Sequence, residues 1–211
     1  METIKKAYEF DIDAKDLMAE GALDQYFYME DLKDRKLTLD QDIDQFSVAE
    51  IVSHIMRYNK EDKDMPADER KPIVLYVVSN GGDVGAGFEL IDVISNSKTP
   101  VYTVNLGYQY SMGFLIGLAG HKRYAMNNAT FLMHDGSSFV YDSGSKVQDR
   151  AKFMEKIEHR IKDFVISRTN ITAKEYDKKQ RVEWYMFADE AKEKGVTDYI
   201  VGVDCDIDAI I

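Results

Sequence analysis

The chain has 211 residues, which fits one domain of ordinary size, with or without appendages, and 45% of them are hydrophobic, enough for a sizeable core. Its net charge of −11 argues against a nucleic-acid-binding protein and against docking on anionic membranes, because both require clustered Lys and Arg. The single cysteine, Cys205, excludes an internal disulfide framework and a cysteine-based zinc site.

The beginning of the chain is acidic and only weakly periodic. We treat residues 1–31 as an N-terminal arm or appendage, which could be a strand-forming arm, a partner-binding segment or a mobile end. Residues 1–16 are charged throughout, and no apolar run in the chain approaches the length of a membrane span. We therefore expect no leader, no membrane segment and a cytoplasmic location.

A sharper pattern begins at Ser47. Ser47 and Glu50 fit a capping box, in which the serine hydroxyl accepts from the Glu50 amide and the Glu50 side chain reaches back, so a helix is predicted to begin there. Its apolar residues share one helical face: Val48, Ile51, Val52, Ile55 and Met56. The charged residues 59–71 that follow are typical of a solvated loop.

Strands and helices then alternate along the chain. Short apolar runs predict strands at residues 72–78, 101–107, 129–134 and 196–204. Helices are predicted around residues 88–94, over 111–119, over 145–168, from 172 onward and over 188–195, the last one stopped by Gly195. This alternation predicts an α/β fold with parallel sheet crossovers.

Three turns, each at the end of an apolar strand, carry candidate functional residues. Gly81 and Gly82 follow the first strand, Ser111 follows the second, and His134 ends the third. Ligand sites in open α/β sheets lie beyond the carboxyl ends of the strands, so these residues are candidates for one site. Each also has a structural interpretation: Ser111 as a helix cap, the glycine pair as a simple turn, and His134 as a core residue.

The other histidines, Gln109 and the missing cofactor motifs restrict which reactions the chain could catalyse. His54 and His159 lie on predicted helices among charged neighbours, where surface positions are expected, and His121 lies in a polar loop. Gln109 stands where the G-x-S-x-G nucleophile elbow requires glycine, which disfavours an α/β-hydrolase. The sequence has no metal-binding cluster and no G-x-x-x-x-G-K-[ST] phosphate loop, so we expect no metal and no cofactor, and any use of ATP must belong to a partner.

Four segments occur together in this chain: "YVVSNGGDVGAGFELID", "GYQYSMGFLIGLAG", "KRYAMNNATFLMH" and "ADEAKEKGVTD". In order and approximate spacing they resemble the family of the Clp protease proteolytic subunit. The resemblance runs from about Leu32 to Val203. It implies a crotonase-like fold with a peptidase domain over residues 32–211, a protruding handle that begins in the 145–168 helix, and a serine endopeptidase with a Ser-His-acid triad.

The resemblance assigns candidate roles to particular residues. Ser111 in "YSMG" matches the family's nucleophile, and His134 in "MH" matches its general base. Counting back from "ADEA" places Glu183 where the family has an aspartate, with Asp177 as the alternative, since a carboxylate of either kind can orient the imidazole. The backbone amides of Gly82 and Met112 match the family's oxyanion hole.

The resemblance also implies partners. It implies two stacked heptameric rings, a tetradecamer that encloses peptide or unfolded-protein substrates, with an AAA+ unfoldase as the candidate partner. Residues 137–142, "SSFVYD", are expected to pair with an extended substrate as an added strand. The chain departs from the family's pattern in having Asn80 in place of a proline, Tyr108 and Tyr110 among residues that are usually small, and Asp135-Gly136 in place of Gln-Pro.

Two other functions remain open at this point. A crotonase-type acyl-CoA enzyme would share the fold and an oxyanion hole of two amides but needs no Ser-His pair, so Ser111 and His134 favour the peptidase. A catalytically decayed scaffold would keep the fold without the activity, and the tyrosines at 108 and 110 and the glutamate at 183 point in that direction.

Overall fold

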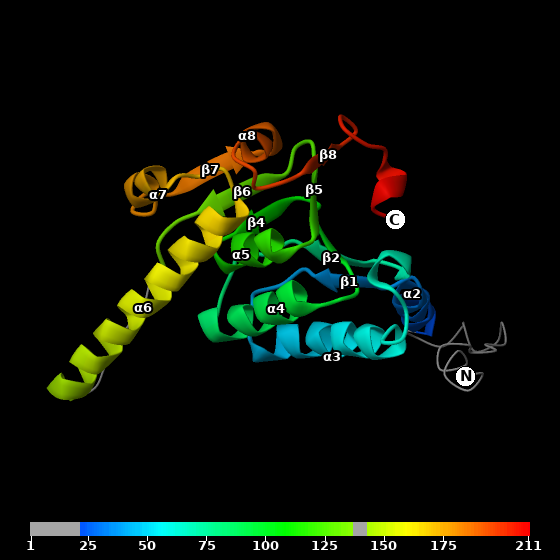
Figure 1. The fold of residues 1–211 in the computed structure, drawn as a ribbon, viewed down its shortest axis with the longest axis horizontal. Helices are drawn as coiled ribbons and strands as arrows, with labels where there is room; N and C mark the ends of the chain where they lie inside the picture. The colour runs from blue at the N-terminus through cyan, green and yellow to red at the C-terminus, as the bar shows by residue number, and fades with distance from the viewer. Residues whose placement is uncertain (1–21, 137–142) are drawn as a thin grey trace.

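The computed structural model describes residues 22–136 and 143–211, in which helices and strands alternate (Figure 1). The strands are β1 (Lys36–Leu39), β2 (Ile73–Val77), β3 (Val101–Asn105), β4 (Tyr108–Tyr110), β5 (Lys122–Met126), β6 (Thr130–Met133), β7 (Trp184–Phe187) and β8 (Tyr199–Val201). The helices are α2 (Ala22–Lys33), α3 (Gln45–Glu61), α4 (Val84–Asn96), α5 (Met112–Ala119), α6 (Gly144–Arg168), α7 (Ala173–Lys179) and α8 (Ala188–Glu193), with short 3₁₀ helices η3 (Ala67–Glu69) and η4 (Ile207–Ala209).

Two sheets organise these elements. The main sheet has five parallel strands in the order β1-β2-β3-β5-β8. The smaller sheet has the order β4-β6-β7, in which β4 is parallel and β7 antiparallel to β6. Helices α3 and α4 pack against each other beneath the main sheet in the view of Figure 1. The predicted α/β fold with parallel crossovers is confirmed.

Helix α5 connects the two sheets. It contacts β3 of the main sheet and β4 of the smaller one, and all of its 8 residues are buried. An uncharged helix that is apolar on every side cannot stand at a surface without exposing apolar area to water. The prediction of an interior helix over residues 111–119 is confirmed, and its N-terminus is held where the two sheets meet.

The start of helix α3 differs from the prediction. Helix α3 begins three residues earlier than expected, because Asp44 is its N-cap and accepts from the amides of Phe46 and Ser47. Ser47 is the other half of that capping box, since its hydroxyl accepts from the Asp44 amide at 2.9 Å. The assignment of the cap to Ser47 with Glu50 was therefore wrong.

The apolar run at residues 101–107 also behaves differently from its prediction. It holds the whole of β3, but the chain then bends and β4 enters the other sheet. The Asn105 side chain stabilises the bend, because it accepts from the Gly107 amide at 3.0 Å and donates to the Thr130 carbonyl at 2.9 Å. Strands β1, β4, β5 and β7 and helix α2 were not predicted.

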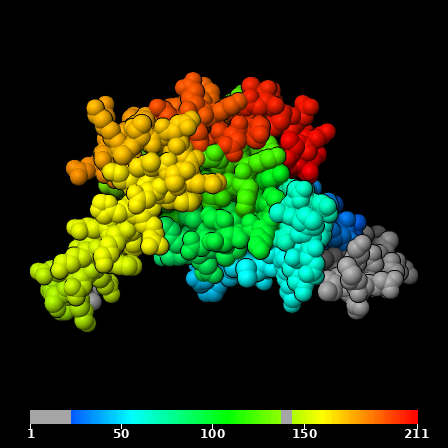
Figure 2. Space-filling view, viewed as in Figure 1, coloured from blue at the N-terminus to red at the C-terminus, as the bar shows by residue number. Residues whose placement is uncertain are grey.

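Helix α6 confirms the prediction of a long helix over residues 145–168. It extends away from the body in Figure 1, and Figure 2 shows that its N-terminal half stands clear of the remaining surface. Val165 is its only buried residue. Residues 1–21, most of the predicted arm, lie outside the described residues, and α2 spans the predicted boundary at residue 31.

Within residues 22–136 and 143–211, no helix is both long enough and apolar enough to cross a membrane.

Candidate functional site

Ser111 and His134 directly follow two strands that end at the same edge of the smaller sheet. Strand β4 ends at Tyr110, which lies opposite Leu132 of the parallel strand β6, and β6 ends one residue later, at Met133. The Ser111 amide donates to the Leu132 carbonyl at 3.0 Å. Since both strands run in one direction, the residues that follow them, Ser111 and His134, are neighbours at the carboxyl edge.

Ser111 forms a sharp turn between β4 and α5. It has φ 53° and ψ −117°, and among the described residues only Arg35 shares a positive φ without being glycine. Ser111 occupies the N-cap position of α5, but its hydroxyl makes no capping hydrogen bond. The hydroxyl is therefore available for other contacts, on a strained strand-to-helix turn of the kind that presents nucleophiles, although Gln109 breaks the usual glycine pattern.

The glycine turn after β2 lies against Ser111. Gly81 and Gly82 have φ of 104° and 150°. A Cβ built on Gly81 would stand 2.8 Å from Ser111 Cβ and 3.0 Å from the Met112 nitrogen, and one on Gly82 would collide with the Ile43 backbone. Both glycines are thus required by close backbone approach, and Gly81 is the one in contact with Ser111.

Two backbone amides near this turn are unoccupied. The Met112 amide belongs to the first turn of α5, whose N–H groups have no partner within the helix. In the part of the chain that the structure describes, neither Met112 N–H nor Gly82 N–H donates a hydrogen bond, whereas the Gly81 amide donates to Ser79 Oγ at 3.1 Å. A helix N-terminus also carries partial positive charge, so an oxyanion beside Ser111 would be stabilised here.

Glu183 reaches the same edge from the opposite direction. Strand β7 is antiparallel to β6, with Trp184 opposite Met133, so Glu183 is level with His134. The Glu183 side chain is exposed, and its Oε2 accepts from the Tyr185 hydroxyl at 3.1 Å. This hydrogen bond is the main reason why the pKa of Tyr185 is raised. Glu183 therefore has the right level in the sheet, but its carboxylate is engaged by a tyrosine.

Asp177, the alternative acid, lies on α7. It is exposed and forms an ion pair with Lys162 of α6 at 2.6 Å. The chain that follows α7 returns towards His134, because the Asp135 amide donates to the Gln180 carbonyl at 2.6 Å. Across the described ranges, no hydrogen bond joins Ser111 to His134 or His134 to either acid.

Three tyrosines cover the sheet next to Ser111. The rings of Tyr108 and Tyr110 lie 5.2 Å apart, and Tyr110 packs edge-to-face on Tyr185 at 5.7 Å. The Tyr110 hydroxyl is 2.9 Å from Thr130 Oγ1, which fixes the middle ring. Sequence reasoning noted Tyr108 and Tyr110 but missed Tyr185, because β7 was not predicted. Its four residues are all apolar or aromatic, so the alternation of buried and exposed side chains along β7 is visible only in the structure.

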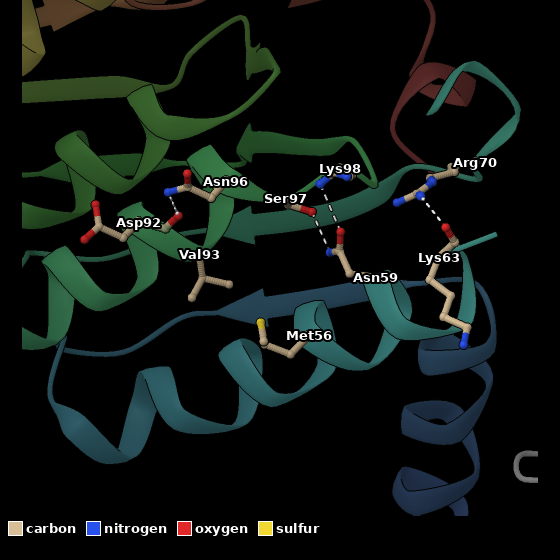
Figure 3. A pocket seen from close by; sticks show the side chains of 9 residues that line it. All are labelled: Met56, Asn59, Lys63, Arg70, Asp92, Val93, Asn96, Ser97 and Lys98. Atoms are coloured by element: carbon tan, nitrogen blue, oxygen red, sulfur yellow. Dashed lines mark hydrogen bonds between the residues drawn. The ribbon is translucent and has the colours of Figure 1, made fainter. Parts of the chain in front are cut away.

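A separate cavity of about 450 Å³ lies between α3 and α4, away from Ser111 (Figure 3). Asn59 bridges the elements that form it. Its amide donates to the Ile55 carbonyl and to Ser97 Oγ at 2.9 and 2.7 Å, and its oxygen accepts from the amides of Lys98 and Thr99 at 2.9 and 3.1 Å. Asn59 has no capacity left for a ligand, so we interpret this cavity as a structural junction. Residues 137–142, predicted to pair with substrate, lie outside the described residues.

The comparison with known proteins adds independent information. A sequence model of the family described as Clp protease matches residues 20–204 of the chain. The chain is 31% identical over 139 residues to the ATP-dependent Clp protease proteolytic subunit 2 of Treponema pallidum (strain Nichols), covering 65% of this chain and 70% of that protein. It is 29% identical over 172 residues to the ATP-dependent Clp protease proteolytic subunit 1 of Bacillus cereus (strain ATCC 10987 / NRS 248), covering 81% of this chain and 86% of that protein.

Proposed function

This chain belongs to the Clp protease family, and we propose that it is a serine endopeptidase with Ser111 as nucleophile and His134 as general base. Its family membership agrees with the predicted crotonase-like fold class. The observation that carries the proposal is the shared sheet edge: Ser111 and His134 follow adjacent parallel strands, and Ser111 adopts a strained turn whose hydroxyl does not cap its helix.

The proposed reaction follows the chemistry of acyl transfer. His134 takes the Ser111 proton as the hydroxyl attacks the peptide carbonyl, and the amides of Gly82 and Met112 hold the oxyanion. His134 then protonates the leaving amine, and water hydrolyses the acyl-enzyme. The unoccupied Gly82 and Met112 amides support this assignment, as does the Gly81 amide, which is already engaged by Ser79.

Glu183 is our candidate for the third member of the triad. Glu183 lies beside His134 at the end of β6, which supports this role. Its carboxylate must, however, give up the hydrogen bond from Tyr185 and turn towards His134. Asp177 would have to leave Lys162. Removal of the triad carboxylate alone is expected to lower kcat by on the order of 10⁴. Peptide hydrolysis by Glu183→Gln and Asp177→Asn, measured side by side, assigns the role to the variant with the larger loss.

We further propose that the protein works as an oligomeric chamber, made of two stacked heptameric rings, with an ATP-driven unfoldase as partner. Both relatives are named as proteolytic subunits of an ATP-dependent protease, which supports this division of labour. Helix α6 supports the assembly, because a 25-residue helix with one buried residue leaves apolar side chains for another subunit to cover.

A decayed scaffold is the second candidate, and a specific observation favours it. Among the described residues the serine, the imidazole and the acids are not joined by hydrogen bonds, and Glu183 is held by Tyr185. Such contacts are often long in resting enzymes and tighten only with substrate, so the arrangement is compatible with both candidates.

Labelling with a fluorophosphonate separates the candidates, because the reagent reacts only with an activated serine. We expect labelling of the wild type, loss of the label in Ser111→Ala, and full labelling of Ser53→Ala, a control at an exposed position of α3. His134→Ala should lower peptide hydrolysis by on the order of 10⁶. Equal, near-zero hydrolysis by the wild type and His134→Ala would establish the scaffold, and acyl-CoA turnover without labelling would establish a crotonase-type enzyme.

A further inference from the structure

A polar cleft of about 740 Å³ lies at the amino-terminal ends of β5 and β8, beside the last turn of α6. Four cationic side chains line it, those of Lys122, Arg123, Arg168 and Lys192. Among the described residues that line it, Asp198 is the only carboxylate. In a chain with a net charge of −11 this local excess of positive charge is unusual. Ser111, the glycine turn and His134 follow strands at the opposite, carboxyl-terminal edges, so the cleft is separate from the candidate active site.

Three of these cations already have partners. The Arg123 guanidinium donates two hydrogen bonds to the Asp198 carboxylate, one of 3.0 Å from Nε, and its Nη1 donates to the carbonyls of Arg168 and Gly195. Lys192 is paired with Asp204. Lys122 lies over the Tyr102 ring at 5.0 Å. These contacts satisfy the groups without an external anion.

Arg168 is different, because its partners are neutral. Its Nε donates to the Leu118 carbonyl at 2.9 Å, and its Nη2 donates to the carbonyls of Ala119 and Gly120. Its Nη1 donates to no group in the described residues, and no carboxylate forms an ion pair with it there. Burial chiefly, and the neighbouring charge of Arg123, lower the pKa of Arg168, although the Asp198 carboxylate opposes them, so an additional anion would stabilise this cation. One edge of the guanidinium is thus bound to protein, and its remaining donor is unused.

His121 supplies a second unused donor. Its Nδ1 accepts from the Val101 amide at 3.0 Å, and in the neutral ring this places the proton on Nε2. The side chain is exposed and lines the same cleft. The His121 and Arg168 side chains therefore line one basic cleft, His121 from the bend before β5 and Arg168 from the end of α6.

We propose that this cleft is a binding site for a phosphate group, free or carried by a small molecule, held by Arg168 and His121. A phosphate has several acceptor oxygens pointing in different directions, which suits donors that approach from separate elements, and guanidinium is its preferred planar partner. Three carbonyls near the end of α6 already accept side-chain hydrogen bonds, which lessens their repulsion of an anion. The Phe164, Val165 and Arg168 carbonyls are occupied by Ser167, Thr169 and Arg123, respectively. The site does not depend on the proposed peptidase activity.

Titration of the full chain with inorganic phosphate, followed by ³¹P NMR, tests the site. The wild type should show saturable binding. Ser167→Asp places a carboxylate at the exposed rim of the cleft and should weaken binding by about tenfold or more through charge repulsion. Ser53→Asp makes the same change at an exposed position on α3 and should leave the affinity as in the wild type. Because neither position is buried, both variants should fold, which circular dichroism checks.

The outcomes are distinct. Competition by glycerol 3-phosphate at lower concentration than free phosphate would assign the site to a phosphoester, and equal or weaker competition would assign it to the free ion. Non-saturable binding, or equal affinities of Ser167→Asp and the wild type, would overturn the proposal. Arg168→Gln should also lose binding, although it removes contacts to the end of α5, so the Ser167→Asp result decides.

Discussion

At the scale of single residues, Ser111 adopts a backbone conformation that its own side chain disfavours. Its φ of 53° lies in the left-handed region, where a residue with a Cβ is strained by about 1–3 kcal/mol. The surrounding structure must hold it there, and the glycine turn after β2 does so from one side. Gly81 is so close that a methyl group in its place would meet both Ser111 and the Met112 nitrogen.

Gly81→Ala is therefore expected to damage both stability and the candidate site. Alanine at φ 104° would be strained and would push against Ser111 Cβ, 2.8 Å away, so the free energy of unfolding should fall by about 1–3 kcal/mol. If Ser111 is the nucleophile, peptide hydrolysis should fall at least as far as after loss of an oxyanion donor, on the order of 10²–10³. Urea unfolding and peptide turnover measure the two effects.

Gly107→Ala provides the matched control. Gly107 also lies in a turn of the same region, but a Cβ there would meet nothing within 4 Å and its φ is not positive. Its replacement should change the free energy of unfolding by no more than about 0.5 kcal/mol. If the two alanine variants proved equally stable and equally active, close approach of Gly81 would not be what maintains the Ser111 turn.

At the scale of elements, the helices and strands that could be predicted are those with a long pattern of apolar residues within their own sequence. Helix α5 is apolar throughout and α6 repeats its apolar residues for many turns, so both were found. Strand β7 was missed because four residues are too few to establish a period. The end of β3 was missed because Asn105 fixes it through Thr130, 25 residues away, and such a contact has no local signal.

The contact between α2 and α3 buries His54, which a prediction from neighbouring residues placed at the surface. His54 was expected at the surface, but its side chain is only 13% exposed, and Nδ1 is buried without a hydrogen-bond partner among the described residues. Tyr28 of α2 lies 3.4 Å from its Nε2 and donates to Glu50, and Tyr58 stacks on the ring. The prediction failed because α2, which covers this side of α3, was itself not predicted.

This burial predicts a pH dependence of stability. Burial chiefly, and the charge of Arg57, lower the pKa of His54, although Glu50 opposes them. The unfolded state, with an ordinary pKa of about 6.5, then binds the proton more readily than the folded state, so the stability contributed by neutral His54 is lost as the pH falls from 7 towards 5. His54→Phe keeps the ring but cannot titrate. Relative to the wild type it should gain stability on acidification, by at most about 1.4 kcal/mol per pH unit.

Urea unfolding of both proteins between pH 5 and 8 checks the sign. The comparison is between two proteins at each pH, so the carboxylates that both share cancel. His54→Gln, which also cannot titrate but lacks an aromatic ring, should show the same trend from a lower starting stability. A wild-type-to-variant difference that stayed constant over this range would show that His54 has the same pKa in both states.

At the scale of the whole molecule, the candidate site depends on pairings that no single segment encodes. Ser111 and His134 were candidates from the sequence alone, because Ser111 follows an apolar run and His134 ends one, and their catalytic roles stay a prediction. Their closeness follows from β4 pairing with β6, and the level of Glu183 follows from β7 pairing with the other side of β6. The Glu183–Tyr185 contact could not be predicted, because it depends on which face of an unpredicted strand both residues share.

Helix α6 raises the last question at this scale, which is what covers its apolar side chains. Phe153 is 61% exposed, and of the 25 helical residues only Val165 is buried. Isolated helices of this composition gain little stability from propensity alone, so packing by another subunit is the natural explanation. We expect the wild type to sediment as a large assembly and Phe153→Glu to shift it towards smaller species, because a charge in an apolar interface is costly.

The change in sedimentation caused by Phe153→Glu should be large and should come from the subunit interface alone. Phe153 is mostly exposed within the single chain, so the variant monomer should unfold within about 0.5 kcal/mol of the wild-type monomer. Gln148→Glu adds a negative charge at another exposed position of α6 and should sediment like the wild type, because a charge alone does not disrupt packing. Sedimentation velocity at micromolar concentration distinguishes these cases. A wild-type monomer, or a Phe153→Glu assembly of unchanged size, would mean that α6 does not join subunits and that the chamber must be built through another surface.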